Sequence, residues 1–241
     1  MSQAVVCGRT SSRRGPGLGA AARAAAPGSG TLRVASLSAL GNTLVPRAIR
    51  AFRDRHPETA ITLHITTSAQ VRELVLGGEF GIGLAADEVD LSGVDHRVFS
   101  SVRAVCAIPP GHELARRTAI RAADLHRRPF VALAPEDRAR ARLEAVFEAE
   151  GVRPDVVVET SFSATVCALV LEGVGLGLVN SGAAEGFAER GLVLRPFEPE
   201  VHFRTLLLFR PDTQRSVLIK RFTAALLEAR GARRPSGPGP V

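Results

Sequence analysis

The chain has 241 residues, enough for one large domain or two small lobes, and 45% of them are hydrophobic, as in globular proteins. Seven of its 31 basic residues lie in two segments without acids, residues 1–30 and 230–241, which accounts for the formal net charge of +7. The other 24 basic residues meet all 24 acidic residues between Thr31 and Ala229, so the composition does not support a basic nucleic-acid-binding groove.

The three cysteines and the N-terminal segment indicate a cellular compartment. Cys7, Cys106 and Cys167 show no C-x-x-C spacing, and a reducing cytoplasm is the simplest setting for them. The segment AAARAAA is interrupted by Arg23, so it lacks the continuous apolar core of a secretory signal. No stretch approaches the about 18 apolar residues that span a membrane. We therefore expect a cytoplasmic protein without a membrane partner.

The first half of the chain alternates strands and helices. Residues 1–30 are rich in Gly, Ala, Arg and Ser and predict a disordered tail. A helix is predicted to open at Asn42 and to end near His56-Pro57, and a second one, capped by Thr67 or Ser68, ends at Gly77-Gly78. Strands are predicted at LRVASL, ITLHI and FGIGLA. This order predicts a mostly parallel sheet with helical crossovers.

A second series of the same kind follows a crossing. The stretch RAVCAIPPGHELA predicts a strand that runs into Pro109-Pro110-Gly111, where the chain leaves one lobe for another. Helices are predicted from Arg138 to Glu150 and from Val217 to Ala229. Further strands are predicted at PFVALA, DVVVE, VLRPF and FRTLLLF. The sequence therefore predicts an α/β fold with the order βαβαβ, crossing, βαβαβ, return.

The glycines of GVGLG, residues 173–177, allow two interpretations. A dinucleotide-binding loop needs its glycines after a strand and at the start of a helix. Here an apolar helical repeat over residues 166–170 comes first, with the hydroxyl residues of 161–165 as candidate caps. Gly173 is therefore predicted to end that helix, and LGLV to form a buried strand.

Three strand-to-helix turns carry small hydroxyl residues. Each turn offers hydroxyls together with free amides at the positive end of a helix, which suits a bound carboxylate. Ordinary helix capping explains any one of these turns, whereas three turns that face one cleft favour binding. The turns are Ser36 and Ser38, then Thr66, Thr67 and Ser68, then Ser161, Ser163 and Thr165.

Five blocks in order resemble the effector-binding domain of LysR-type transcriptional regulators, over about four-fifths of the chain. They are RVASLSALGNTLVPRAIRAFRDRHP, LVLGGEFGIGLAADEVD, CAIPPGHELA, FVALAPEDRAR and ETSFSATVCALVLEGVGLGLVN. The resemblance implies two Rossmann-like lobes of periplasmic-binding-protein type II architecture, joined by two crossover strands, with a small effector between them. It implies lobe I at residues 31–107 plus 203–230, lobe II at 108–202, and disordered tails at 1–30 and 231–241.

The last two blocks, with AADEVDLSGVDH, look most like the branch of the family whose regulators respond to opines, basic amino acids or diaminopimelate. The resemblance thus implies an amino-acid-like or opine-like carboxylate as effector. It also implies a homo-oligomer formed through the effector-binding domain. This sequence has Asn180-Ser181 where related ones tend to have Asn-Pro, so the identity of the effector is not transferred. Carried over turn by turn, the cleft residues are Ser38, Ala39, Thr67, Ser68, Pro135, Ser161, Phe162, Ser163, Ala164 and Asn180.

Members of this family carry a winged helix-turn-helix ahead of the block that starts here at Thr31. Residues 1–30 are too short and too rich in Gly and Pro to encode one. The chain as given is therefore expected to sense an effector without reading DNA. DNA becomes a partner only if a helix-turn-helix is supplied.

Two other classes of function fit the sequence less well. A stand-alone solute-binding protein for amino-acid-like ligands would share the lobes, but it predicts export. An enzyme would need a nucleophile, a base and an orienting group, whereas the six histidines are scattered and Glu136-Asp137 is typical of a solvated helix cap. The prediction is a non-enzymatic regulatory domain without cofactor or metal.

Overall fold

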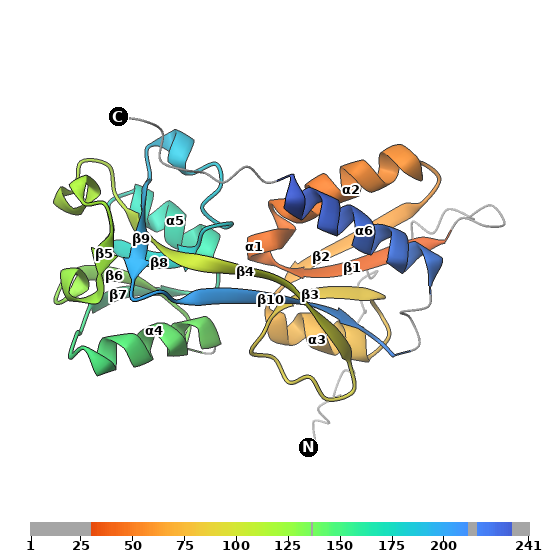
Figure 1. Ribbon diagram of the computed structural model, residues 1–241, viewed down its shortest axis with the longest axis horizontal. Coiled ribbons are helices and arrows are strands. Elements are labelled where there is room, and N and C mark those ends of the chain that lie inside the picture. The colour runs from red at the N-terminus through yellow and green to blue at the C-terminus, as the bar shows by residue number, and fades with distance from the viewer. Residues whose placement is uncertain (1–29, 136, 212–215, 233–241) are drawn as a thin grey trace, which may run out of the picture.

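One long strand, β4 (Asp95–Ile108), joins two α/β lobes (Figure 1). The computed structural model describes residues 30–135, 137–211 and 216–232. Most of the two predicted tails, residues 1–29 and 233–241, lies outside the described residues. The predicted α/β fold of two lobes is confirmed.

Lobe I alternates strands and helices, as its sequence predicts. Besides the first part of β4, its elements are β1 (Thr31–Leu37), α1 (Ser38–Gly41), α2 (Leu44–Arg55), β2 (Ala60–Thr66), α3 (Ser68–Leu76), β3 (Ile82–Ala86), β10 (His202–Phe209) and α6 (Val217–Gly231). Thr67 caps α3, as predicted, and Gly77 follows its last residue.

Lobe II repeats the pattern with short additions that the sequence did not predict, namely β5 and three 3-10 helices. Its elements are η1 (Glu113–Arg116), β5 (Ile120–Arg121), η2 (Ala122–Leu125), β6 (Pro129–Leu133), α4 (Arg138–Ala149), β7 (Asp155–Thr160), α5 (Ser163–Leu171), β8 (Leu176–Asn180), η3 (Ala188–Arg190) and β9 (Val193–Glu198).

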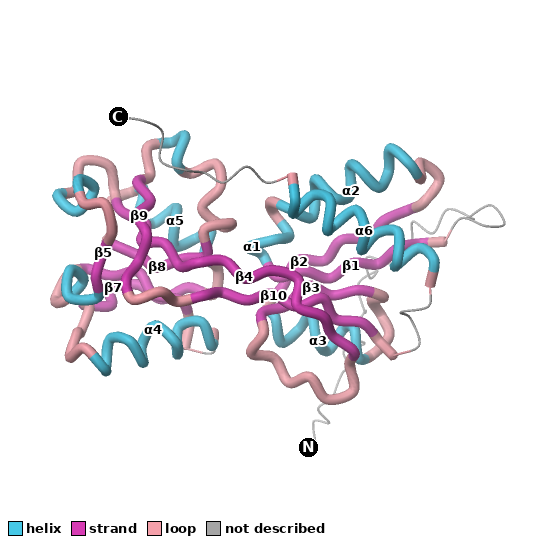
Figure 2. The backbone as a smooth tube through the Cα atoms, in the orientation of Figure 1, coloured by secondary structure: helices cyan, strands magenta, loops and turns pink. Residues whose placement is uncertain are grey.

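The strand order confirms parallel sheets with crossovers in both lobes. The main path runs β2-β1-β3-β10-β4-β8-β6-β7, and β9 pairs with β4 and β5. Within lobe I, β1 lies parallel to β2 and β3; within lobe II, β6 lies parallel to β7 and β8. The strands at the centre of the path, β10 and β4, are antiparallel to each other and form the connection (Figure 2).

The connection depends on a change of partner along β4. Residues 95–103 pair with β10 in lobe I, and residues 104–107 pair with β8 in lobe II. The returning chain stays close, because the Ala104 amide donates to the Val201 carbonyl over 2.7 Å. A single backbone ladder thus runs through both lobes and fixes how their strand ends face each other.

The lobe I sheet is buried on both faces because its strands are apolar at successive positions. On the face toward α2 and α6, the core includes Val34, Ile82 and Phe222. On the face toward α3, Ala35, Val71 and Leu208 form a second cluster. Figure 1 shows α2 and α6 on one side of the sheet and α3 on the other.

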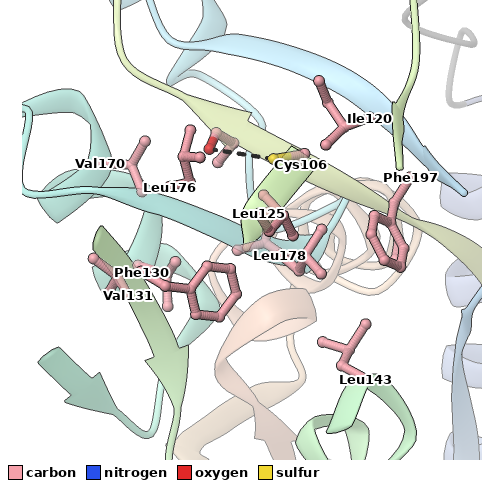
Figure 3. Packing of buried hydrophobic residues seen from close by; sticks show 14 of the residues in the cluster. Cys106, Ile120, Leu125, Phe130, Val131, Leu143, Val170, Leu176, Leu178 and Phe197 are labelled. Carbon is pink, nitrogen blue, oxygen red and sulfur yellow. Dashed lines mark hydrogen bonds between the residues drawn. The ribbon is translucent and has the colours of Figure 1, made fainter. Parts of the chain in front are cut away.

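The lobe II core is a single cluster around β8 and β6 (Figure 3). Phe147 of α4 stacks edge-on against Phe130 and Phe197, with ring centroids 6.0 and 6.3 Å away, a favourable aromatic arrangement. Cys106 and Cys167 are buried free thiols, and burial raises the pKa of both. Neither cysteine is therefore a reactive thiolate.

One predicted helix begins later than expected. Asn42 does not open the helix that follows β1: it lies at the end of the short helix α1, and α2 begins at Leu44 after Thr43. The Thr43 hydroxyl donates to the Ala39 carbonyl over 2.8 Å and so closes α1. This extra turn places Ser38 and Ala39 directly beyond the end of β1.

The GVGLG segment closes a helix, as predicted. α5 ends at Leu171, and Gly173 adopts a φ of +82°, a left-handed conformation that favours glycine. Gly175 lies against the start of β6: a Cβ atom there would lie 2.6 Å from the Pro129 carbonyl oxygen and 2.8 Å from its carbon. Gly173 thus allows the turn after α5, and Gly175 allows two backbone segments to pack closely.

We expect Gly175→Ala to destabilise the protein by about 1–3 kcal/mol, because the obstructing atoms belong to the backbone and cannot rotate away. Urea unfolding followed by far-UV circular dichroism measures the change. Gly231→Ala is the matched control, since its added Cβ meets nothing within 4 Å and it lies at the end of α6. Equal stability of the two variants would contradict this account of GVGLG.

Candidate functional site

A cavity of about 610 Å³ lies between the two lobes, within the usual size of small-molecule sites. Both lobes and the crossover contribute to its wall. The residues at or just after the carboxyl ends of six strands line it: Leu37, Thr66, Ala86, Ala134, Ser161 and Asn180. Parallel sheets bind ligands at this edge, because loops and helix N-termini meet there.

Eight of the ten residues that the resemblance placed in the cleft line this cavity. They are Ser38, Ala39, Thr67, Ser68, Ser161, Phe162, Ser163 and Asn180. Pro135 and Ala164 do not line it. Pro135 is exposed, and the neighbouring Ala134 and Asp137 reach the cavity instead. Ala164 follows Ser163 on a helix, so its side chain is turned by about 100° from that of Ser163.

The N-terminus of α3 presents hydroxyls held by backbone contacts. The Thr67 hydroxyl accepts from the Gln70 amide over 3.4 Å, a long capping bond. Ser68 Oγ accepts from the Ala86 amide over 3.0 Å, which ties α3 to the end of β3. A serine hydroxyl that accepts one bond keeps its own proton to donate. Ser68 is therefore oriented and still able to donate to a ligand.

The N-terminus of α5 has no side-chain cap, which corrects the prediction that a hydroxyl of residues 161–165 caps this helix. The capping position is occupied by Phe162, which has no acceptor. The Ser163 side chain is buried against the cavity, and among the described residues its hydroxyl has no hydrogen-bond partner. Uncapped amides at a helix N-terminus favour an anion.

Asn180 is a buried amide at the end of β8. Its Oδ1 accepts from the Gly182 amide over 2.7 Å, and 6% of the residue is exposed. With its oxygen engaged, the NH₂ group retains donor capacity toward the cavity. Asn180 and the uncapped end of α5 thus supply donors from lobe II.

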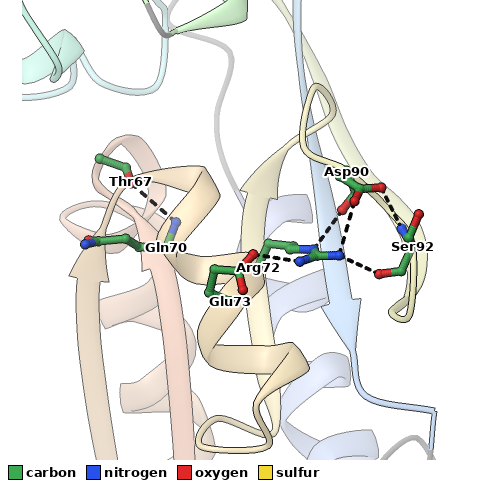
Figure 4. A network of polar contacts seen from close by, with 6 residues as sticks. All are labelled: Thr67, Gln70, Arg72, Glu73, Asp90 and Ser92. Atoms are coloured by element: carbon green, nitrogen blue, oxygen red, sulfur yellow. Dashed lines mark hydrogen bonds and ion pairs between the residues drawn. The ribbon is translucent and has the colours of Figure 1, made fainter.

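Arg72 also lines the cavity, and no sequence pattern predicts it. Its guanidinium group donates to the Asp90 carbonyl over 3.1 Å and to the Ser92 carbonyl over 2.7 Å, and pairs with Asp90 and Glu73 (Figure 4). Its side chain is 14% exposed. Arg72 therefore holds the β3–β4 loop against α3, and its charge is matched by the neighbouring carboxylates.

No group of three or more His, Cys, Asp and Glu residues within the described residues could hold a metal ion. In the same part of the chain, no helix is both long and apolar enough to cross a membrane.

Comparison with known proteins decides the family. The model of the LysR substrate binding domain matches residues 25–231. The chain belongs to this family. It is 30% identical over 200 residues to the regulatory protein NocR of Agrobacterium tumefaciens (strain T37), covering 83% of this chain and 67% of NocR.

Two further comparisons agree with the family. The transcriptional activator protein LysR of Escherichia coli (strain K12) is 30% identical over 198 residues, which cover 82% of this chain and 63% of that relative. The chain thus spans about two thirds of the length of these regulators. The regulatory domain of CcmR from Synechocystis PCC6803, solved in complex with 2-PG, superposes with a TM-score of 0.73 at 18% identity and covers 82% of this chain and 96% of that domain. This likeness shows the shared fold.

In this LysR substrate-binding domain, two ion pairs connect the lobes. Arg142 of α4 donates to both carboxylate oxygens of Asp87, over 2.9 and 3.0 Å, and to the His202 carbonyl over 3.1 Å. Arg47 of α2 pairs with Glu185 of lobe II. In the first pair a single guanidinium nitrogen, Nη2, contacts both carboxylate oxygens of Asp87, while Nη1 donates to the His202 carbonyl at the start of β10.

Glu88 lies beside the first of these pairs and lines the cavity. Its side chain is 10% exposed, and Arg142 Nη1 lies 3.5 Å from its Oε1. Burial raises the pKa of Glu88 from its ordinary value of 4.5 to about 7; Arg142 opposes the shift, and Asp87 and Asp137 add to it. Glu88 is thus a carboxyl group that changes charge near neutral pH.

A second cavity, of about 420 Å³, lies in lobe II between α4 and strands β6 and β7. Its wall is mainly apolar, with Phe130, Leu143 and Phe147 among its residues. None of the predicted cleft residues lines it. It shares no lining residue with the cavity between the lobes.

The raised pKa of Glu88 predicts a pH-dependent stability. As pH rises from about 4.5 to 7, Glu88 ionises first in the unfolded chain, so the folded state loses stability, and the loss is complete above pH 7. We expect Glu88→Gln to remove this loss. The variant should match the wild type at pH 4 and be more stable at pH 8 by about 1 kcal/mol, a value reduced for solvent screening on the cavity side.

Thermal unfolding at both pH values checks this expectation. Glu172→Gln, which removes an exposed carboxylate after α5, is the control and should keep the pH dependence of the wild type. A Glu88→Gln variant that loses stability at pH 8 would contradict the raised pKa.

Proposed function

We propose that this chain is the effector-binding part of a LysR-type transcriptional regulator, and that its inter-lobe cavity binds a small amino-acid-like or opine-like carboxylate. The observation that carries the proposal is the convergence of six strand ends and two helix N-termini on one cavity. The family relationship to NocR and LysR, both named as regulatory proteins, supports the regulatory role.

The donors of the cavity suit a carboxylate. The uncapped α5 N-terminus offers amides, and Ser163, Ser68 and Asn180 offer donor groups from both lobes. When a carboxylate enters a cleft that is partly shielded from water, hydrogen bonds from several such donors replace the ones it loses to water. Contacts from both lobes also make the affinity depend on how the lobes are closed.

Regulation then follows from hinge closure. The backbone passes between the lobes in β4 and in the returning chain before β10, so a small change in their dihedral angles alters the angle between the lobes. A bound effector favours the closed arrangement by its extra contacts. In this proposal the domain acts in the cytoplasm without catalysis, and DNA is contacted only where a helix-turn-helix is supplied.

We expect arginine, ornithine, lysine, diaminopimelate or an opine to raise the melting temperature of the chain. An effector at 100 times its dissociation constant adds about 2.7 kcal/mol of stability. Thr67→Ala combined with Ser163→Ala should abolish this shift, because it removes hydroxyls from both sides of the cavity. A dye-based thermal scan measures the effect.

Thr62→Ala combined with Thr118→Ala is the matched control, since both hydroxyls are exposed and neither lines the cavity. It should keep the full shift. A folded protein that none of these compounds stabilises would overturn the proposed effector class, and a shift that survives loss of Thr67 and Ser163 would overturn the proposed carboxylate contacts.

We further propose that the domain forms a homodimer through its two edge strands. Among the described residues β2 pairs only with β1, and β7 only with β6. Both edge strands expose apolar side chains: Ile65 of β2 is 38% exposed, and Val156 and Val157 of β7 are 43 and 46% exposed. Unpaired apolar edges are surfaces that proteins usually cover.

The flanking helices add charge complementarity. α2 exposes Arg50 and Arg53, whereas its Arg47 and Arg55 pair with Glu185 and Glu228 of the same chain, and the end of α4 exposes Glu148. In a two-fold dimer the β2–α2 side of one copy can face the β7–α4 side of the other, and the same contact is made twice. Basic and acidic faces then meet.

Val157→Asp should convert the dimer to a monomer, because it places two carboxylates in the contact, one from each copy. Size-exclusion chromatography with light scattering should change from twice the chain mass of 25.5 kDa to that mass. Val98→Asp is the control, because Val98 is 69% exposed but lies on β4. A wild-type monomer at all concentrations would contradict the dimer.

A further inference from the structure

The cavity wall carries more negative than positive charge. Two guanidinium groups and four carboxyl groups line it, so its formal charge is −2 when all six are ionised. These residues are Arg72, Arg204, Glu73, Glu88, Asp90 and Asp137. A ligand with only a carboxylate would meet net repulsion there, whereas a ligand that also carries cationic groups would be attracted.

Three of the four carboxyl groups already have structural partners. Glu73 and Asp90 pair with Arg72, at 2.6 and 3.3 Å. Asp137 accepts from the Ala139 amide over 2.9 Å and caps α4. Their charges hold the β3–β4 loop and the start of α4 in place.

Glu88 is different because its nearest cation is committed elsewhere. Arg142 directs its hydrogen bonds to Asp87 and to the His202 carbonyl, and approaches Glu88 only to 3.5 Å. With 10% of its side chain exposed, Glu88 is also poorly hydrated. A buried carboxylate with a distant partner gains most from an additional cation.

Glu88 also lies across the cavity from Ser163 and the N-terminus of α5, which are proposed to hold the effector carboxylate. α1 and α5 contact each other across the cleft, which places Ser38 and Ser163 at one side. Asp87 and Arg142 bridge the lobes on the side of β3 and α4, where Glu88 lies. Figure 1 shows α4 and α3 below the crossover strands and α1 and α5 above them.

We propose that Glu88 is a specificity-determining residue that receives a cationic group at the distal end of the effector. This inference rests on the proposed function, in which α5 and its hydroxyl neighbours hold the effector carboxylate. The ligand then spans the cavity, with its carboxylate at the α1–α5 side and its distal cation at Glu88. Arg142 acts as a positioning residue, because it fixes the neighbouring Asp87 from the other lobe.

The charge state of Glu88 makes this contact depend on pH. Its carboxyl group faces Arg142 and Asp137 from lobe II and Asp87 from its own segment, and its pKa is raised to about 7. A cation binds the ionised form. Preference for a cationic ligand should therefore be greater at pH 8 than at pH 6, while the affinity for a neutral isostere changes little.

Calorimetric titration of the full chain with matched ligands tests the proposal. The chain has no Trp or Tyr, so calorimetry is preferable to intrinsic fluorescence. The probes are L-ornithine against L-norvaline, and L-arginine against L-citrulline, each pair differing in the distal charge. In the wild type we expect the cationic member to bind at least about 10-fold more tightly, as for a hydrogen-bonded charge.

Glu88→Gln should lose that preference and leave norvaline within about 2-fold of its wild-type affinity. Glu88→Asp, which keeps the charge on a shorter side chain, should retain part of the preference and so separates charge from packing. Glu172→Gln, with an equal loss of charge outside the cavity, should behave as the wild type. Thermal melts of each variant confirm folding.

The outcomes separate the two proposals. If ornithine and norvaline bind equally well to the wild type, or if Glu88→Gln weakens both equally, the role of Glu88 is overturned and the carboxylate site stands. If the wild type binds none of the four amino acids and no opine, the proposed effector class is overturned together with the role of Glu88.

Discussion

The structure depends on the change of hydrogen-bond partner along β4. Because this one strand pairs with β10 in lobe I and with β8 in lobe II, the two sheets cannot move independently of its backbone. The parallel strands of both lobes therefore end at a common cleft, and the polar turns that follow them share one cavity of about 610 Å³. A joint made of so little chain also leaves the lobe angle free to respond to what the cavity holds.

The polar groups of the cavity are of two kinds: some are bonded within the protein, and others have few partners. Arg72, Asp90 and Asp137 make hydrogen bonds within the protein and fix the loop after β3 and the start of α4. The end of α5 has no side-chain cap, and the guanidinium group nearest to Glu88, that of Arg142, is 3.5 Å away. Groups left short of partners beside a cavity are the ones from which a ligand gains most, because they regain interactions that burial removed.

Much of the fold could be predicted from local patterns, and part of the site with it. Helical repeats predict α3 and α5 closely, the capping residue Thr67 marks the start of α3, and GVGLG is a helix end as predicted. The sequence did not predict the short helix α1, because four residues are too few to show a helical repeat of apolar positions. Asn42 is also a residue type that often caps helices, which favoured a helix start there. The cap of α5 was also misassigned, since three hydroxyl residues compete there and only the observed backbone places Phe162 at the capping position.

The sequence by itself determined the alternation of elements, the family resemblance and the hydroxyl turns, because these follow from residue order and from the chemistry of neighbouring residues. Tertiary structure alone decided which charges meet. Arg142 and Asp87 are 55 residues apart, and no local pattern indicates that a helix of one lobe reaches a loop of the other. The environment of Glu88 was likewise invisible, because burial and the distance to a cation depend on how two distant segments pack, and these quantities set the pKa and binding role of a carboxyl group.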